Sequence, residues 1–290
     1  LINVLVADLG SGKVKPDYLY PGSVSSAKPL SQLMEDSGAV AAVNGGYFDI
    51  NNTNAPLGVG VSQDGVVTMP DPASVRPGTN TPVIFTEDGL GHIAPVTLEA
   101  SATVNGQPAE FTIAAVNAIG IAPANVMLYT DAWGNAKRTR PVGDAPAAEV
   151  IIAADGTVKS VSTEISAEPL AQGEQALVGR DEAREQLLKL KEGDTVTITT
   201  GVTSDLGKVA AAVAGNERLL TAGQPVPISD DGPQPRTAIG FANDGRTMIA
   251  VTVDGRQETS KGIRRADLAT LMLSLGATDA VNLDGGGSTT

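Results

Sequence analysis

The sequence contains no cysteine and only one histidine, and aromatic residues make up 3% of its 290 residues. Without cysteine, the chain can form no disulfide, no thiolate nucleophile and no cysteine metal site. The single histidine, His92, leaves little material for a histidine-relayed serine or a histidine-ligated metal. We therefore expect no metal site and no cofactor, although carboxylates alone could still bind Ca²⁺ or Mg²⁺.

Runs of basic residues and long apolar runs are also missing. The formal net charge is -13 at pH 7, which argues against binding to nucleic acid or to an anionic membrane surface. No apolar stretch reaches the roughly 18 residues that a transmembrane helix needs, so we expect no membrane insertion. The sequence begins at Leu1 and not at Met, so we expect an N-terminus that has been processed or trimmed.

Apolar residues make up 41% of the chain, and 33 glycines and 18 prolines are spread along it. This composition is typical of a globular fold with many turns. We find no linker and no repeat, and predict one domain over residues 1–290. Its predicted fold class is α+β (mixed α/β), with a central mixed β-sheet and flanking helices.

Local patterns predict the elements of this domain. Alternating residues predict strands at the N-terminus (INVLVADL) and at DTVTITT, RTAIGF, TMIAVTV and DAVNL. The run AVAAV, residues 39–43, predicts a short buried strand, and residues 147–162 predict a hairpin with an Asp-Gly turn. Helices are expected in SSAKPLSQLMEDSG, in RDEAREQLLKLKEG and over residues 263–275, each ending at a glycine.

Three predicted strands end in polar residues with glycine: AVAAVNGGYFD (39–49), IAVTVDGRQ (249–257) and DAVNLDGGGSTT (279–290). A fourth stretch, PQPRTAIG (233–240), places Arg236 and Thr237 at the beginning of a strand. Each could be a simple turn. Together, they indicate a site at one edge of a sheet, where glycine allows the backbone to approach a ligand closely.

The residue types at these positions suit a site that binds an anion and cleaves a glycosidic bond. Arginine binds phosphate or carboxylate bidentately, a pair of carboxylates carries out glycoside cleavage, and asparagine and glycine amides donate hydrogen bonds to hydroxyls or oxyanions. The predicted catalytic residues are Asp284, Asp49, Asp254 and Asn44, and the predicted substrate-binding residues are Arg236, Thr237, Arg256, Gly45, Gly46, Asn282, Gly285, Gly286, Gly287 and Ser288. Because aromatic residues are few, we expect recognition to be mainly polar.

The stretches VNGGYFD (43–49), RTAIG (236–240), DGRQ (254–257) and NLDGGGST (282–289) closely resemble the phosphodiester glycosidase family. Weaker likeness lies in VMLYTDAWG, EGDTVTITT and AGNERLLTAGQ, so the resemblance runs from about residue 37 to the end, in the family's order. The family continues beyond the GGGS motif, which leaves open a truncation of the domain at its C-terminus.

The resemblance implies a hydrolase that releases the sugar from a sugar-1-phosphodiester and leaves a phosphomonoester. It also implies a bacterial-type, secreted protein whose partner is a small or polymeric glycosyl phosphodiester. Two alternatives stay open: a phosphodiesterase that cleaves the P–O bond, and an inactive module that binds glycans or cell wall. The sequence leaves the sugar, the stereochemistry and the oligomeric state undetermined.

Overall fold

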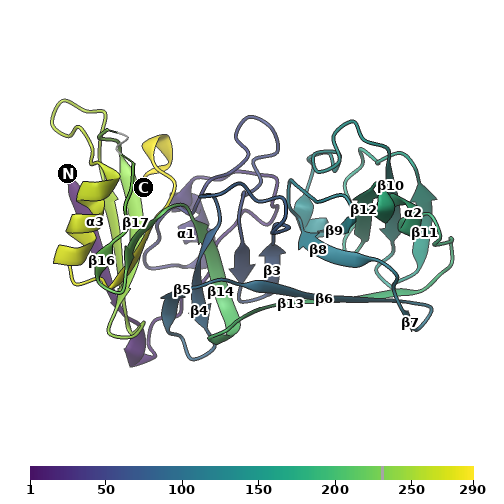
Figure 1. Ribbon diagram of the computed structural model, residues 1–290, viewed down its shortest axis with the longest axis horizontal. Helices are drawn as coiled ribbons and strands as arrows, with labels where there is room; N and C mark the ends of the chain where they lie inside the picture. Colours follow the sequence, from purple (N-terminus) through teal and green to yellow (C-terminus); the bar gives the residue numbers. More distant parts are fainter. Residues whose placement is uncertain (230–231) are drawn as a thin grey trace.

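The computed structural model describes residues 1–229 and 232–290. These residues form nineteen strands in three sheets, with three α-helices that are each ten residues or shorter. The molecule is elongated, with one sheet at each end and the third between them (Figure 1). The predicted fold class, a single mixed sheet with flanking helices, is therefore wrong. All strand pairs in the three sheets are antiparallel except β8–β9.

The six-stranded sheet holds both ends of the chain. In spatial order its strands are β1 (Ile2–Asp8), β18 (Thr247–Val253), β17 (Arg236–Ala242), β19 (Asp279–Asn282), β15 (Arg218–Thr221) and β16 (Gln224–Pro225). Helix α3 (Arg265–Ser274) packs on one face, where Leu268 and Met272 are fully buried. Leu271 and Leu275 pack against the same core, so the apolar side chains of this helix lie on one face.

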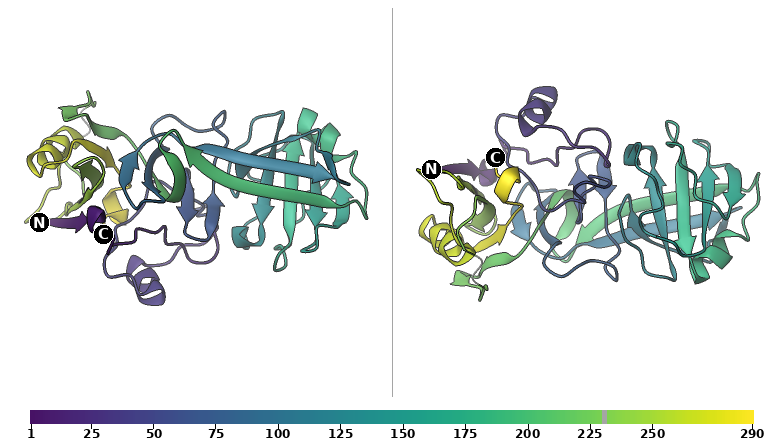
Figure 2. Two further views of the ribbon diagram at one scale, coloured as in Figure 1. Left: turned by 90° about the horizontal axis from the view of Figure 1, so that it is seen from below. Right: turned by 90° about the horizontal axis from the view of Figure 1, so that it is seen from above.

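The middle of the molecule is built from hairpins. Its sheet contains β3 (Gly65–Thr68), β2 (Gly60–Ser62), β14 (Gly207–Gly215), β13 (Val196–Ser204), β6 (Thr97–Val104) and β7 (Gln107–Pro108), and β14 also pairs with β4 (Thr81–Thr86), which pairs with β5 (Gly91–Ile93). The long strands β6 and β13 extend toward the far end, as Figure 2 shows. The short helix α1 (Leu30–Ser37) lies outside these strands (Figure 1).

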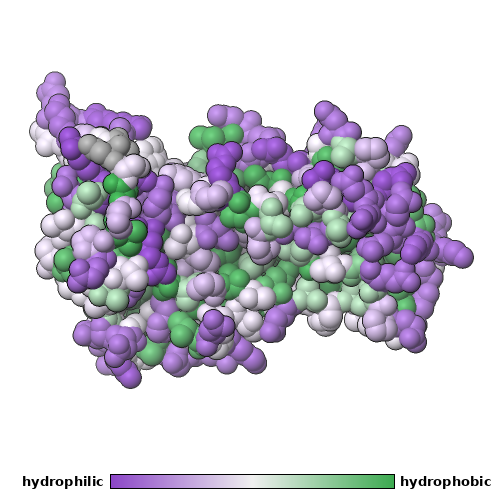
Figure 3. Space-filling model, in the orientation of Figure 1, coloured by the Kyte–Doolittle hydropathy of each residue, from purple (hydrophilic) through white to green (hydrophobic). Residues whose placement is uncertain are grey.

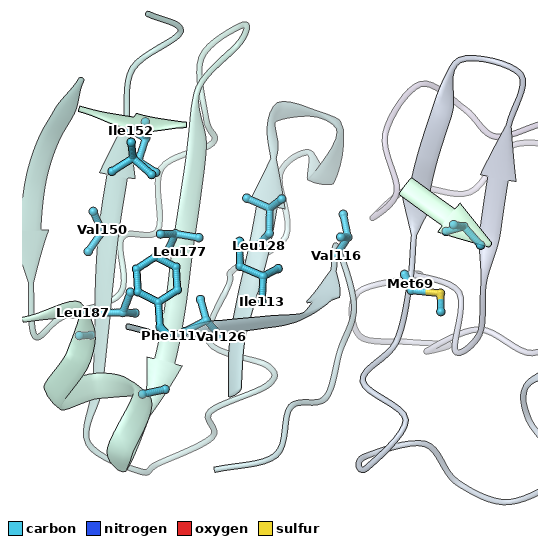
Figure 4. Packing of buried hydrophobic residues seen from close by; sticks show 14 of the residues in the cluster. Met69, Phe111, Ile113, Val116, Val126, Leu128, Val150, Ile152, Leu177 and Leu187 are labelled. Atoms are coloured by element: carbon cyan, nitrogen blue, oxygen red, sulfur yellow. The ribbon is translucent and has the colours of Figure 1, made fainter. Parts of the chain in front are cut away.

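The five-stranded sheet forms the far end. Its order is β11 (Val158–Ser162), β10 (Ala147–Ile152), β12 (Gln175–Arg180), β9 (Asn125–Thr130) and β8 (Thr112–Val116). Helix α2 (Glu182–Leu187) covers its core, in which Leu177 and Leu187 are fully buried (Figure 4). The predicted hairpin over residues 147–162 is confirmed as β10 and β11. On the face shown in Figure 3, hydrophilic residues gather over this far end.

The predicted strand at residues 39–43 is the main local error. The segment is irregular, joins none of the described sheets, and leaves Val40 fully exposed. A strand needs a neighbouring strand to bond its N–H and C=O groups, and none lies beside this run. Only Val43 packs on a core, against the face of the six-stranded sheet opposite α3.

Candidate active site

The six-stranded sheet brings three of the predicted motif segments to one edge. Strand β17 begins at Arg236 and runs antiparallel to β18 and β19, so the ends of both neighbours lie beside its beginning. Arg236 pairs with Val253, and Ala238 pairs with Asn282. The DGR segment after β18 and the LDGGG segment after β19 therefore leave the sheet next to Arg236.

Asn44 joins the NGG segment to this edge. Its side-chain Nδ2 donates to the carbonyl of Asp284 at 2.9 Å and to that of Gly45 at 3.1 Å. The Thr237 hydroxyl donates to Asn44 Oδ1 at 2.6 Å, and the Asp284 N–H donates to Gly45 O at 3.0 Å. The amide of Asn44 thus holds the backbone on which Asp284 sits.

Gly46 lets this segment pass close to the middle sheet. A Cβ built on Gly46 would lie 2.4 Å from the carbonyl oxygen of Ala214 in β14, a separation that no side chain tolerates. The contact fixes the position of the following residue, Tyr47, beside the end of β14. The predicted importance of this glycine is therefore explained by backbone packing.

The glycine turn after Asp284 is closed by its own hydrogen bonds. The Gly285 N–H donates to Asp284 Oδ1 at 2.8 Å, and the Gly286 N–H donates to Pro235 O at 3.0 Å. Residues 286–288 form one 3₁₀ turn, in which the Ser288 N–H donates to Gly285 O at 3.1 Å. Two of the three glycine amides are thus used within the protein, which leaves less donor capacity for an anion than the sequence suggested.

Two arginines flank the turn. Arg236 is buried, and a Cβ built on Gly285 would lie 3.8 Å from its Nη1. A Cβ built on Gly286 would lie 3.1 Å from Nη2 of Arg256, whose guanidinium donates to Gln234 Oε1 at 3.0 and 3.2 Å. An anion placed over the glycine turn would therefore meet positive charge on both sides.

The other two predicted carboxylates have different surroundings. Asp49 accepts hydrogen bonds from the Thr53 hydroxyl at 2.8 Å and from Arg140 Nε at 3.2 Å. Burial alone would raise the pKa of Asp49, but the hydrogen bonds from Arg140 and Thr53 outweigh it and lower the pKa. Asp254 lies at the end of β18, where its backbone N–H donates to Leu1 O and its carbonyl accepts from Ser260.

Three further residues, Tyr47, Glu217 and Arg265, were not predicted as site residues. Burial raises the pKa of the Tyr47 hydroxyl, and the negative charges of Glu217 and Asp284 raise it further, while Arg236 and Arg265 act in the opposite direction. Tyr47 therefore stays protonated at neutral pH, within the electrostatic reach of two carboxylates and two guanidiniums. The sequence carried a signal for Glu217, because AVAGNER is another apolar strand that ends in glycine and polar residues.

Two hollows lie near Asp284 and share lining residues, among them Asn44 and Gly45. The smaller, of about 270 Å³, is lined by Asp284, Asn44, Phe48 and Tyr20, among others. The larger, of about 970 Å³, is mainly apolar and runs between β1 and the irregular segment 39–43. Within residues 1–229 and 232–290, no group of three or more His, Cys, Asp or Glu residues is arranged to hold a metal ion.

Comparison with known proteins confirms the resemblance read from the motifs. The model of the phosphodiester glycosidase family matches residues 147–290, and over these residues the chain belongs to that family. These residues include Arg236, Arg256, Asp284 and Glu217, but not the NGG segment.

Two solved structures share the fold of the whole chain. A hypothetical protein from Synechocystis superposes with a TM-score of 0.76 and 19% identity, over 100% of this chain and 54% of the other. A protein of Burkholderia pseudomallei K96243 that is described by name as exported superposes with a TM-score of 0.75 and 21% identity, over 99% of this chain and 68% of the other.

A curated relative is the SPbeta prophage-derived protein YomE of Bacillus subtilis (strain 168), 52% identical over 54 residues. This match spans 19% of the present chain and 8% of YomE. The chain thus corresponds to a small part of that relative and to about half of the Synechocystis protein.

Proposed function

We propose that the protein is a hydrolase that cleaves the glycosidic C–O bond of a sugar-1-phosphodiester, releasing the free sugar and a phosphomonoester. The observation that carries the proposal is the glycine turn after Asp284, which lies between the guanidiniums of Arg236 and Arg256. A carboxylate beside an anion site is what this reaction needs. The family match over residues 147–290 supports the same chemistry.

In this mechanism the two arginines stabilise the leaving group. Arg256, with Arg236 behind the turn, neutralises the phosphate as the bond between the anomeric carbon and the phosphate oxygen breaks. The electron pair of that bond goes to the phosphate oxygen. Since a phosphate ester leaves readily, the reaction depends less on a general acid than ordinary glycoside hydrolysis does.

Asp284 acts at the anomeric carbon of the sugar. Its carboxylate either attacks that carbon or stabilises the positive charge that develops there. Water supplies the oxygen of the released sugar. Asn44 supports this role through its 2.9 Å hydrogen bond to the Asp284 carbonyl, which holds the backbone of the carboxylate in place.

We further propose that the protein acts outside the cytosol on a small or polymeric glycosyl phosphodiester. The family resemblance and the name of the Burkholderia neighbour support this location. Among the described residues, no helix is both long enough and apolar enough to span a membrane.

The deciding experiment is hydrolysis of a panel of sugar-1-phosphodiesters in ¹⁸O water, with the products identified by mass spectrometry. We expect the label in the released sugar, because water attacks carbon. Label in the phosphate would establish P–O cleavage and overturn the proposed mechanism. Saturable binding without turnover would instead identify the chain as a binding module.

A further inference from the structure

Glu217 lies directly beside the end of β19, the strand that leads to Asp284. The Asn216 N–H donates to Asn282 O at 2.7 Å, and the Asn282 N–H donates to Glu217 O at 2.9 Å. Two residues of one segment therefore face one residue of the other, as in a β-bulge. Bulges redirect side chains and occur often next to active sites.

The side chain of Glu217 is held at one oxygen only. Its Oε1 forms an ion pair with Arg265 Nη1, 2.6 Å away, at the beginning of α3. Its Oε2 is enclosed and has no hydrogen-bond partner within the described residues. One carboxylate oxygen is thus oriented by the protein, while the other is left for a group that the protein does not supply.

Asn216 adds a second unsatisfied polar group at the same place. Its side chain is fully buried, and neither Nδ2 nor Oδ1 has a partner in the described part of the chain. A buried polar atom without a hydrogen bond costs about 1–3 kcal/mol, so native proteins normally satisfy it with water or a ligand. The neighbourhood of Glu217 is therefore suited to hold water.

Tyr47 connects this neighbourhood with Asp284. The charges of Glu217 and Asp284 both act on its hydroxyl, and these are the carboxylates that raise its pKa. Asp49 and Asp254 are not among the largest causes of that shift. Asp49 is in addition occupied by Arg140 and Thr53, so Glu217 is the better partner for Asp284.

Building on the proposed function, we propose that Glu217 is the second carboxylate of the site and takes the proton from the attacking water. As the water oxygen bonds to the anomeric carbon, one of its protons passes to Glu217 Oε2. The bond that breaks is the one from that carbon to the phosphate oxygen or, if a glycosyl ester forms first, to the Asp284 carboxylate. Arg265 orients Glu217 through Oε1.

The test compares Glu217→Gln and Glu217→Ala with wild type on the best substrate of the panel. The matched control is Glu110→Gln, which removes an exposed glutamate that is also paired, to Lys189, at the far end of the molecule. We expect kcat to fall about 10²–10⁴-fold in both Glu217 variants, the usual contribution of a general base, and to stay unchanged in the control. Thermal unfolding checks that the variants are folded.

Two readouts separate a base from a residue that only supports the fold. Azide is an anionic nucleophile that needs no deprotonation, so it should restore turnover of Glu217→Ala and yield the glycosyl azide. The acidic limb of the kcat/KM profile should disappear in Glu217→Gln. Wild-type kcat in Glu217→Gln would overturn the inference. A loss of turnover would also overturn it if azide did not restore Glu217→Ala and the acidic limb persisted in Glu217→Gln. Absence of turnover in wild type would instead overturn the proposed function, and this inference with it.

Discussion

The two ends of the molecule each hold an arginine–glutamate pair, and the pairs differ in how completely they are bonded. At the far end, Glu149 accepts from Arg138 Nε at 2.7 Å and from the Ser166 N–H at 2.8 Å, so both its oxygens are engaged. In the pair of Arg265 and Glu217, Oε2 of the glutamate has no partner among the described residues.

A tyrosine lies near each pair, and the two tyrosines also differ in burial and hydrogen bonding. Tyr129 is fully buried, donates its hydroxyl to Ala118 O at 3.0 Å, and has its pKa raised by that burial. Tyr47 is partly exposed, and its pKa is raised by burial and by the charges of Glu217 and Asp284. A fully satisfied buried pair specifies and stabilises structure, whereas an incompletely satisfied pair at a sheet edge is available for a ligand.

The largest expected effect is on turnover at the edge of the six-stranded sheet. Asp284→Asn keeps the oxygen that accepts from the Gly285 N–H but removes the negative charge. We expect turnover to fall by about 10²–10⁴-fold, measured as kcat on the same substrate, while the thermal unfolding temperature changes little.

The control for this variant is Asp279→Asn in β19, the strand that precedes Asp284, which alters a partly exposed ion pair with Arg218. Its turnover should stay close to wild type. Near-normal turnover in Asp284→Asn would remove Asp284 from the chemistry and leave the glycine turn as an anion-binding feature alone.

At the far end of the molecule, we expect a substitution to lower stability and to leave turnover unchanged. Glu149→Gln breaks a pair in which both side chains are 2% exposed, so a buried guanidinium loses its countercharge. Such a loss costs about 3–5 kcal/mol of stability. Urea unfolding followed by circular dichroism should show this decrease, while kcat of the folded enzyme stays unchanged.

The matched control is Glu164→Gln, an exposed glutamate close to the same pair in the chain. It should unfold like wild type. If Glu149→Gln unfolded like that control, the buried pair would not stabilise this end, and the contrast between the two pairs would lose its basis.

The sequence predicted many individual strands and the ends of α1 and α3 well, because alternation and terminal glycines are local signals. Helix α2, by contrast, ends at Leu187, before the glycine that was predicted to end it. Gly38 ends α1 in the left-handed conformation, as expected from its position. The fold class could not be obtained this way, because local alternation does not reveal which distant strands pair. Residues 97–104 of β6 pair with residues 196–203 of β13, about 100 positions apart.

The same distinction applies to the site. The convergence of Arg236, Asp254 and Asp284 follows from strand ends that glycine and polar residues mark in the sequence. Glu217 and Arg265 could not be paired from the sequence, because one precedes β15 and the other begins α3. Their proximity depends on how the helix packs on the sheet.

The smallest effect tests a third carboxylate pair, between Asp49 and Arg140. The side chain of Asp49 is 11% exposed and that of Arg140 is 45% exposed, so solvent weakens the pair, and Asp49→Asn should cost about 1 kcal/mol at pH 7. Because the folded-state pKa of Asp49 is lowered, this stability is present above the ordinary aspartate pKa and lost as pH falls through the folded value. Urea unfolding at pH 7 and near pH 3 should show the difference from wild type shrinking, and Arg140→Gln should reproduce it. Turnover near the wild-type value would place Asp49 with the structural pairs, whereas a loss as large as that of Asp284→Asn in a folded variant would return it to the chemistry.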